Sequence, residues 1–101
     1  VTGVECSGEI TVRVVVEKGR TITNPQHEDD TYYYTIASDL DLLAATKQAA
    51  LDMCHLVMKR RGLSFNEAGM LISAAGHAQI CQVVDPKLTA RFALPKHLLG
   101  M

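Results

Sequence analysis

The sequence contains no tryptophan, and aromatic residues make up only 5% of it. Its core must therefore be built from valine, isoleucine, leucine, alanine and methionine. With 48% hydrophobic and 21% charged residues, the chain can bury such a core, which argues against disorder. No apolar run reaches the roughly 18 residues that a membrane-spanning helix needs, so we expect no membrane partner.

An excess of charge of one sign is also absent. The 10 Lys and Arg residues against 11 Asp and Glu residues give a formal net charge of −1 and a pI near 6.4. A nucleic-acid partner usually requires a basic face and a basic pI, so we expect none. Cysteine is scarce, with only Cys6, Cys54 and Cys81. An odd number without a short repeated spacing is a poor disulfide framework and predicts a reducing, cytoplasmic location.

The first third of the chain has the pattern of β-structure. Over residues 9–17, apolar β-branched residues alternate with mostly polar ones, which predicts a strand. Residues 18–19 fit a hairpin turn, after which residues 20–23 would pair back. The loop at 24–30 leads to a third predicted strand at 31–36, rich in aromatic and β-branched residues. The sequence thus predicts an N-terminal antiparallel meander.

The hydrophobic period then changes to that of a helix. Ser38 as the N-cap, followed by two acids, predicts a helix start, and Gly62 suits the C-terminal cap after Arg61. This helix has two apolar faces, so we expect it to be packed on two sides, the second face against something outside these residues. The first face consists of Leu40, Leu43, Ala44, Leu51, Cys54, Val57 and Met58. The second consists of Leu42, Ala49, Met53 and Leu56.

The remaining elements complete the expected fold. Ser64 and Glu67 form a capping-box pattern that predicts a second helix ending at Gly76. Residues 79–84 and 88–94 are predicted strands joined by a turn. The fold class is therefore α+β, with an N-terminal antiparallel β meander, two helices and a C-terminal β pair.

The residues that could bind a metal are poorly spaced for it. Cys54 and His55 point about 100° apart on a helix. His77 and Cys81 would lie ~13 Å apart along a strand, too far to share one ion. Cys54 is better explained as core filling. The acidic residues 28–30 could bind a hard cation, but a solvated loop explains them more simply.

Glu5 is the best candidate for a catalytic residue. It lies among small residues just before the first predicted strand. A carboxylate in such a place can be held in a cleft as a ligand or an acid–base group. An exposed glutamate at a strand edge is the alternative, and the pattern leaves both open.

Several short segments resemble the acetamidase/formamidase family of amide hydrolases, in the same order and at compatible spacing. Three positions depart from the family pattern: Ala37 in place of glycine, Gly69 in place of an aromatic residue, and His77 in place of an acid. The matching segments are Gly3 to Glu5, residues 9–14, Asn24 and Pro25, residues 34–36, residues 62–64, Glu67 and Ala68, residues 70–73, residues 82–86 and residues 94–96.

The resemblance implies that residues 1–101 are either a single domain or the C-terminal third of a longer amidase. Members of the family hydrolyse short linear amides such as formamide and acetamide, releasing ammonia. Glu5 would then be a catalytic residue. A divalent metal, zinc or calcium, would take its ligands mostly upstream of Val1. The implied partners are the small amide, the missing N-terminal part of the protein and further copies in a homo-oligomer.

The chain lacks a nucleophile–base pair of its own, so we expect residues 1–101 alone to be inactive. The alternative to an amidase part is a non-catalytic α+β module, whose long apolar helix mediates interaction or oligomerisation.

Overall fold

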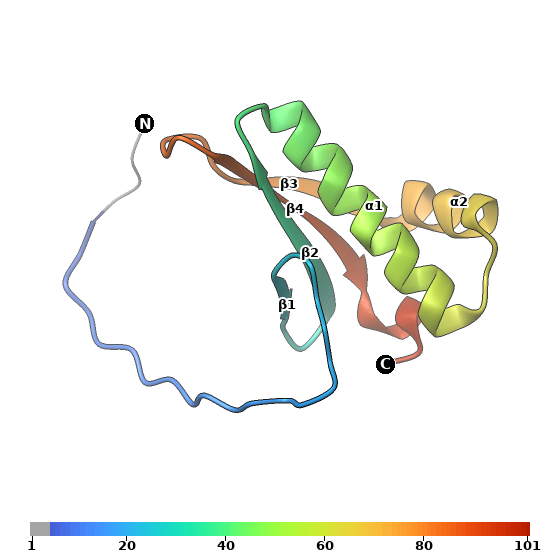
Figure 1. The fold of residues 1–101 in the computed structure, drawn as a ribbon, viewed down its shortest axis with the longest axis horizontal. Helices are drawn as coiled ribbons and strands as arrows, with labels where there is room; N and C mark the ends of the chain where they lie inside the picture. Colours follow the sequence, from blue (N-terminus) through green and yellow to red (C-terminus); the bar gives the residue numbers. More distant parts are fainter. Residues whose placement is uncertain (1–4) are drawn as a thin grey trace.

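The computed structural model describes residues 5–101 and shows a four-stranded antiparallel sheet with α1 packed across one face and α2 beside α1 (Figure 1). The predicted α+β class is confirmed. Within the described residues, no helix is long and apolar enough to cross a membrane. The elements in chain order are β1 (Gln26–Glu28), β2 (Tyr32–Asp39), α1 (Leu42–Arg61), α2 (Phe65–Ala75), β3 (His77–Gln82), β4 (Leu88–Pro95) and a short 3₁₀ helix, η1 (Lys96–Leu99).

The sheet unites both ends of the domain. Its strand order is β1-β2-β4-β3, so the C-terminal pair extends the N-terminal hairpin instead of forming a separate unit. β2 and β4 pair over their whole length, with Tyr34 opposite Ala93 and Ile36 opposite Arg91. β3 starts directly after Gly76, two residues earlier than predicted. It ends at Gln82, whose side chain accepts the backbone N–H groups of residues 84 and 85 and turns the chain.

The strand predicted over residues 9–17 does not form, and this part of the meander prediction is wrong for the structure. No backbone hydrogen bond joins residues 9–16 to another described segment, and the apolar side chains from Ile10 to Val16 are 73–87% exposed. In Figure 1 the segment runs away from the sheet, at the blue end of the colour scale. The alternating pattern predicts the backbone conformation, but a strand also needs a partner. The described sheet provides none. The strand predicted at 20–23 does not form either, and β2 pairs instead with β1, which lies within the predicted loop at 24–30.

Both helices have the caps that the sequence indicates, with one shift. α1 begins after Asp41, whose side chain accepts the N–H of Leu43 at 3.0 Å, because Ser38 is still paired in β2. Gly62 ends the helix in the left-handed conformation with φ 67°, as predicted. α2 starts with the complete capping box, and the Ser64 hydroxyl bond lowers the pKa of Glu67.

The core lies between α1 and the sheet. The small side chains of Ala45 and Ala49 let the helix approach closely, and the hydroxyl of Thr35 donates to the carbonyl of Ala49 at 2.7 Å. Cys54 is buried as predicted, and burial raises the pKa of its thiol. The core cluster is formed by Tyr33, Ala37, Ala49, Met53, Cys54, Val57, Ala68, Ile72, Phe92, Leu94 and Leu99.

The assignment of the two helix faces is wrong in part, although Cys54 and Val57 of the first predicted face are buried in the core as expected. Ala49 and Met53, from the face predicted to pack outside the chain, are fully buried against the chain's own sheet. Exposed apolar residues lie instead on the other predicted face, where Leu40, Leu43 and Leu51 are 74%, 59% and 38% exposed. The buried side of the helix combines the small residues Ala45 and Ala49 with Met53 and so draws on both predicted faces, which a count of apolar positions does not reveal.

Candidate functional site

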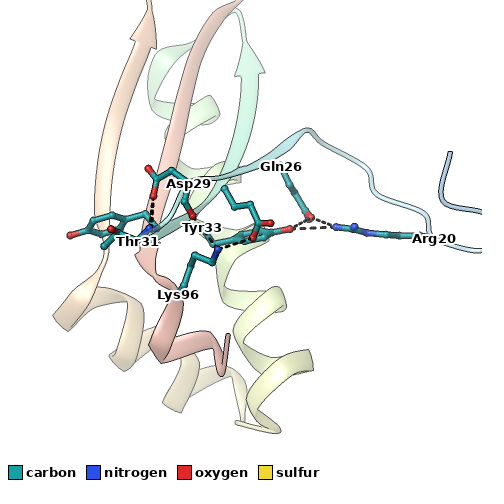
Figure 2. Close-up of polar contacts among 8 residues, drawn as sticks. Arg20, Gln26, Asp29, Thr31, Tyr33 and Lys96 are labelled. Atoms are coloured by element: carbon teal, nitrogen blue, oxygen red, sulfur yellow. Dashed lines mark hydrogen bonds and ion pairs between the residues drawn. The ribbon is translucent and has the colours of Figure 1, made fainter. Parts of the chain in front are cut away.

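A cluster of polar side chains lies where the N-terminal segment meets the first hairpin. The hydroxyl of Tyr33 donates to the side-chain oxygen of Gln26 at 2.7 Å, and Arg20 donates to the same oxygen at 3.2 Å and to the Tyr33 hydroxyl at 3.4 Å. Figure 2 shows these three side chains converging on one point. Arg20 also pairs with Glu17 at 2.8 Å, which raises the pKa of the guanidinium. The cluster thus attaches the N-terminal segment to β1 and β2.

A pocket of about 680 Å³ lies beside this cluster. It contains three cationic side chains, Arg20, Lys59 and Arg60, and the carboxylates of Glu17 and Glu28. Its lining includes no serine, threonine or cysteine. The one hydroxyl in the lining is the phenol of Tyr33, which already donates to Gln26. The full lining is Val15, Glu17, Arg20, Ile22, Gln26, His27, Glu28, Tyr33, Leu56, Lys59, Arg60 and Met101.

The acidic loop considered above as a cation site closes the β1–β2 hairpin. Asp29 accepts the backbone N–H groups of Thr31 and Tyr32 at 2.8 and 2.7 Å and the hydroxyl of Tyr34 at 2.6 Å. These bonds lower the pKa of Asp29 to about 2, and the same carboxylate raises the pKa of Tyr34. Lys96 binds the backbone oxygen of Asp29, and Figure 2 shows it beside this turn. The Asp29 carboxylate therefore has a structural role.

The sheet face opposite α1 carries aromatic and basic side chains. His27 stacks on Tyr34 with 5.3 Å between ring centroids, and the guanidinium of Arg91 lies 4.4 Å from the centre of the same ring. His77 meets Tyr32 edge-on at 6.2 Å. His27 and His77 lie three strand spacings apart, ~14 Å, so they cannot share one metal ion.

Glu5 lies exposed near the start of the N-terminal segment, with no hydrogen bond to any residue from 6 to 101. Gly3 and Val4, which precede it in the matching motif, lie outside the described residues. Nothing in the structure tests its catalytic role, which stays a prediction. Across residues 5–101, no three His, Cys, Asp or Glu side chains are grouped closely enough to hold a metal ion. These residues therefore do not fit a complete metal site.

Sequence reasoning missed the Arg20–Gln26–Tyr33 cluster and the contacts of Tyr34. One signal was available: in three consecutive tyrosines of a strand, the middle ring points to the opposite face from its neighbours. Tyr33 accordingly faces the core side, and Tyr32 and Tyr34 face away from α1. The partners of these side chains could not be read from the sequence, because they come from the N-terminal segment, the β1–β2 turn and the strands β1, β3 and β4.

Comparison with known proteins identifies solved structures that this chain resembles in sequence and in fold. No protein-family model and no curated protein matches the chain. Crystal structures do match. The acetamidase of Bacillus halodurans is 43% identical with a TM-score of 0.73 over 75% of this chain. A predicted acetamidase/formamidase of the thermophile Thermoanaerobacter tengcongensis is 42% identical with a TM-score of 0.77 over 82%. The acetamidase of Yersinia enterocolitica is 30% identical with a TM-score of 0.77 over 83%.

The match is extensive on this chain and partial on the others. This chain spans 26%, 28% and 26% of the lengths of the three solved chains. Three quarters or more of its own residues are matched, at identities that carry sequence as well as fold similarity. Over these residues the chain is similar in sequence and in fold to the three acetamidase/formamidase structures, and the resemblance seen in its motifs is confirmed.

Proposed function

We propose that this chain is part of an amide hydrolase that releases ammonia from short linear amides of the formamide and acetamide type. The observation that carries the proposal is the 43% identity to the Bacillus halodurans acetamidase over 75% of the chain. The two other similar structures are also described as acetamidases or as acetamidase/formamidase. The chain spans about a quarter of each of these proteins, and we propose that it is the C-terminal part.

Glu5 is the residue of this chain that we propose for the chemistry. A carboxylate near the amide could accept a proton from the attacking water and deliver it to the leaving ammonia. The remaining groups, including the ligands of any zinc or calcium ion, would come from outside residues 5–101, because those residues contain no suitable cluster. In the whole protein we expect further copies to assemble, in a reducing, cytoplasmic setting that suits three free cysteines.

We further propose that the isolated chain is inactive. In the described residues the polar contacts beside the pocket and in the acidic loop hold structure: Asp29 closes a turn, and Tyr33 binds Gln26. Neither arrangement pairs a nucleophile with a base. The catalytic constellation therefore needs the larger part of the protein.

The test uses a chimera in which residues 1–101 replace the matching segment of the Bacillus halodurans acetamidase. Ammonia release from formamide and acetamide is measured for the chimera and for the isolated chain. We expect release only from the chimera, and Glu5→Gln should lower its kcat by ~10²-fold or more if Glu5 acts in proton transfer. Glu9→Gln, four residues further along the same segment, is the matched control and should keep the wild-type rate. Release by the isolated chain would contradict the proposed inactivity, and a wild-type rate for Glu5→Gln would make that residue non-catalytic.

The alternative function is a non-catalytic interaction module, and one observation favours it. An open groove lined by Phe65, Asn66, Gly69, Met70, Ser73 and Ala74 lies along α2. Phe65 and Met70 are 53% and 66% exposed there. A chimera that assembles correctly yet releases no ammonia from either amide would support this alternative.

A further inference from the structure

The segment of residues 9–17 has the sequence of a strand and no partner among the described residues. We propose that it forms a strand in a second β-sheet, paired with a strand from the part of the amidase that this chain does not contain. The inference rests on the proposed function, in that it requires the chain to be part of a larger enzyme. It explains why an extended segment keeps five large apolar side chains in water.

The side chains of the segment divide between two faces in the way that a half-buried strand requires. Successive residues of a strand point to opposite sides. One side is uniformly apolar and β-branched, and the other is mixed, with Arg13 and Glu17. The apolar side consists of Ile10, Val12, Val14 and Val16, which are 87%, 75%, 85% and 80% exposed. Such a pattern fits a strand whose one face packs on a core and whose other face meets solvent or polar groups.

The partner is not provided by the described sheet. Its first edge strand, β1, has only three residues, and its other edge, β3, is interrupted by an irregularity between Ile80 and Gln82. A nine-residue segment has no uninterrupted edge of its own length to pair with.

Charge disfavours pairing with the same segment of a second copy. In an antiparallel pair of the full segment, Arg13 lies opposite Arg13 and Glu9 lies opposite Glu17. A parallel pair in register places every charge beside its own equivalent. Like charges that face each other across strands are destabilising. The three solved relatives, in contrast, have 72–74% of their chains outside the matched region, which leaves ample chain for a partner strand.

Strand pairing of this segment would also position Glu5. Glu5 lies four residues before Glu9, about 13 Å away if the chain continues extended. It has the same parity as Arg13 and so would lie on the opposite face from Val12. The segment would thus deliver the candidate carboxylate into the part of the enzyme that holds the other catalytic groups.

Hydrogen exchange on the chimera and on the isolated chain tests the inference. We expect the amides of residues 10–16 to exchange at unprotected rates in the isolated chain. In the chimera they should exchange roughly 100-fold more slowly, as for a paired strand. Unprotected exchange in a folded chimera would overturn the proposal. Protection in the isolated chain would also overturn it: if the protection rises with concentration, the partner is a second copy, and if it does not, the segment pairs within the chain.

Variants provide a second measurement. Val12→Asp with Val14→Asp should lower the Tm of the chimera and leave that of the isolated chain unchanged, whereas the control Thr11→Asp, on the opposite face, should affect neither strongly. An unchanged Tm of the chimera would contradict the inference. If the chimera does not fold, hydrogen exchange of the isolated chain is the test. Unprotected amides in residues 10–16 at every protein concentration support an external partner, and protected amides refute it. If the amides of residues 10–16 are protected in a chimera that is inactive, only the proposed function is contradicted. If the chimera is active but these amides are unprotected, only the proposed strand is contradicted.

Discussion

Replacing glycine by alanine in the α2 region should have opposite effects on stability at Gly69 and at Gly76. At Gly76, which ends α2, an added Cβ would overlap the ring of Phe92 and lie 2.6 Å from the carbonyl oxygen of Ile72. That oxygen accepts the Gly76 N–H at 2.9 Å, so the backbone cannot move away without losing the cap. At Gly69, inside α2, an added Cβ would meet nothing within 4 Å. The backbone at Gly76, with φ −93°, is open to any residue, so the effect there is purely steric.

The magnitudes follow from these contacts. Gly76→Ala forces a methyl group into a filled space, and such overpacking costs about 1–3 kcal/mol. Gly69→Ala removes the backbone freedom of a glycine in a helix interior and should stabilise by about 0.5–1 kcal/mol. The free energies of unfolding of the two variants should therefore differ by roughly 1.5–4 kcal/mol. For a domain of this size, each kcal/mol corresponds to about 4–8 °C in Tm.

The assay is thermal and urea unfolding of the purified chain, followed by circular dichroism. We expect the Tm to fall for Gly76→Ala and to rise for Gly69→Ala relative to wild type. If Gly76→Ala were as stable as Gly69→Ala, the close packing of Phe92 on the end of α2 would be refuted. A fall in Tm for Gly69→Ala would show that the groove along α2 is filled, in contrast to the open surface described above.

Met53→Ala should lower the free energy of unfolding by about 2–5 kcal/mol, because Met53 is fully buried. The control Leu43→Ala, on the exposed side of α1, should lower it far less. Equal losses of stability in urea unfolding would mean that a different side of the helix faces the sheet. Asp29 should make stability fall with acid: its pKa is lowered to about 2 from 3.8, so its contribution is complete above pH 4 and is lost as the pH falls towards 2. The Tm of wild type should therefore exceed that of Asp29→Asn above pH 4, and the two Tm values should converge near pH 2. Asp30→Asn is the control. A difference in Tm that stays constant with pH would show that the turn does not depend on the ionised carboxylate.

Local signals in the sequence predicted the helix ends well, for a physical reason. A cap is decided by a few neighbouring residues: Ser64 and Glu67 satisfy each other's backbone groups, and Gly62 adopts the left-handed conformation that ends α1. The start of α1 was misplaced because Ser38 and Asp41 are both good caps. Pairing of β2 with β4 decided between them, and that contact joins residues 51 positions apart, Ser38 and Thr89.

The N-terminal segment and the long helix show where local patterns stop being informative. Alternation over residues 9–17 specifies an extended conformation, but pairing needs a second strand, and the described sheet offers no suitable edge. On α1, counting apolar positions divides the helix into two faces, yet the side buried in the core takes Ala49 and Met53 from one of them and Val57 from the other. Both errors concern contacts between distant parts of the chain.

The candidate site shows the same contrast between local sequence signals and contacts among distant parts of the chain. Glu5 was singled out by its sequence neighbours and by a family resemblance, and the structure leaves it exposed, without partners in the described residues. The clusters that the structure does assemble, around Tyr33 and Tyr34, join segments that no sequence pattern had linked. These clusters hold the hairpin and attach the N-terminal segment, which fits a domain that supports a site completed elsewhere.

The location of the exposed apolar residues argues for more than one missing contact. Three separate parts of the fold carry exposed apolar residues: the segment of residues 9–17, the side of α1 with Leu43 and Leu51, and the groove of α2 with Phe65. A two-fold dimer has one self-complementary patch and would bury one such surface. A larger covalently connected part can cover several at once, because joining it to the chain adds no cost of association for each contact. This reasoning favours a longer connected chain, as proposed above, over a second copy as the cover of residues 9–17.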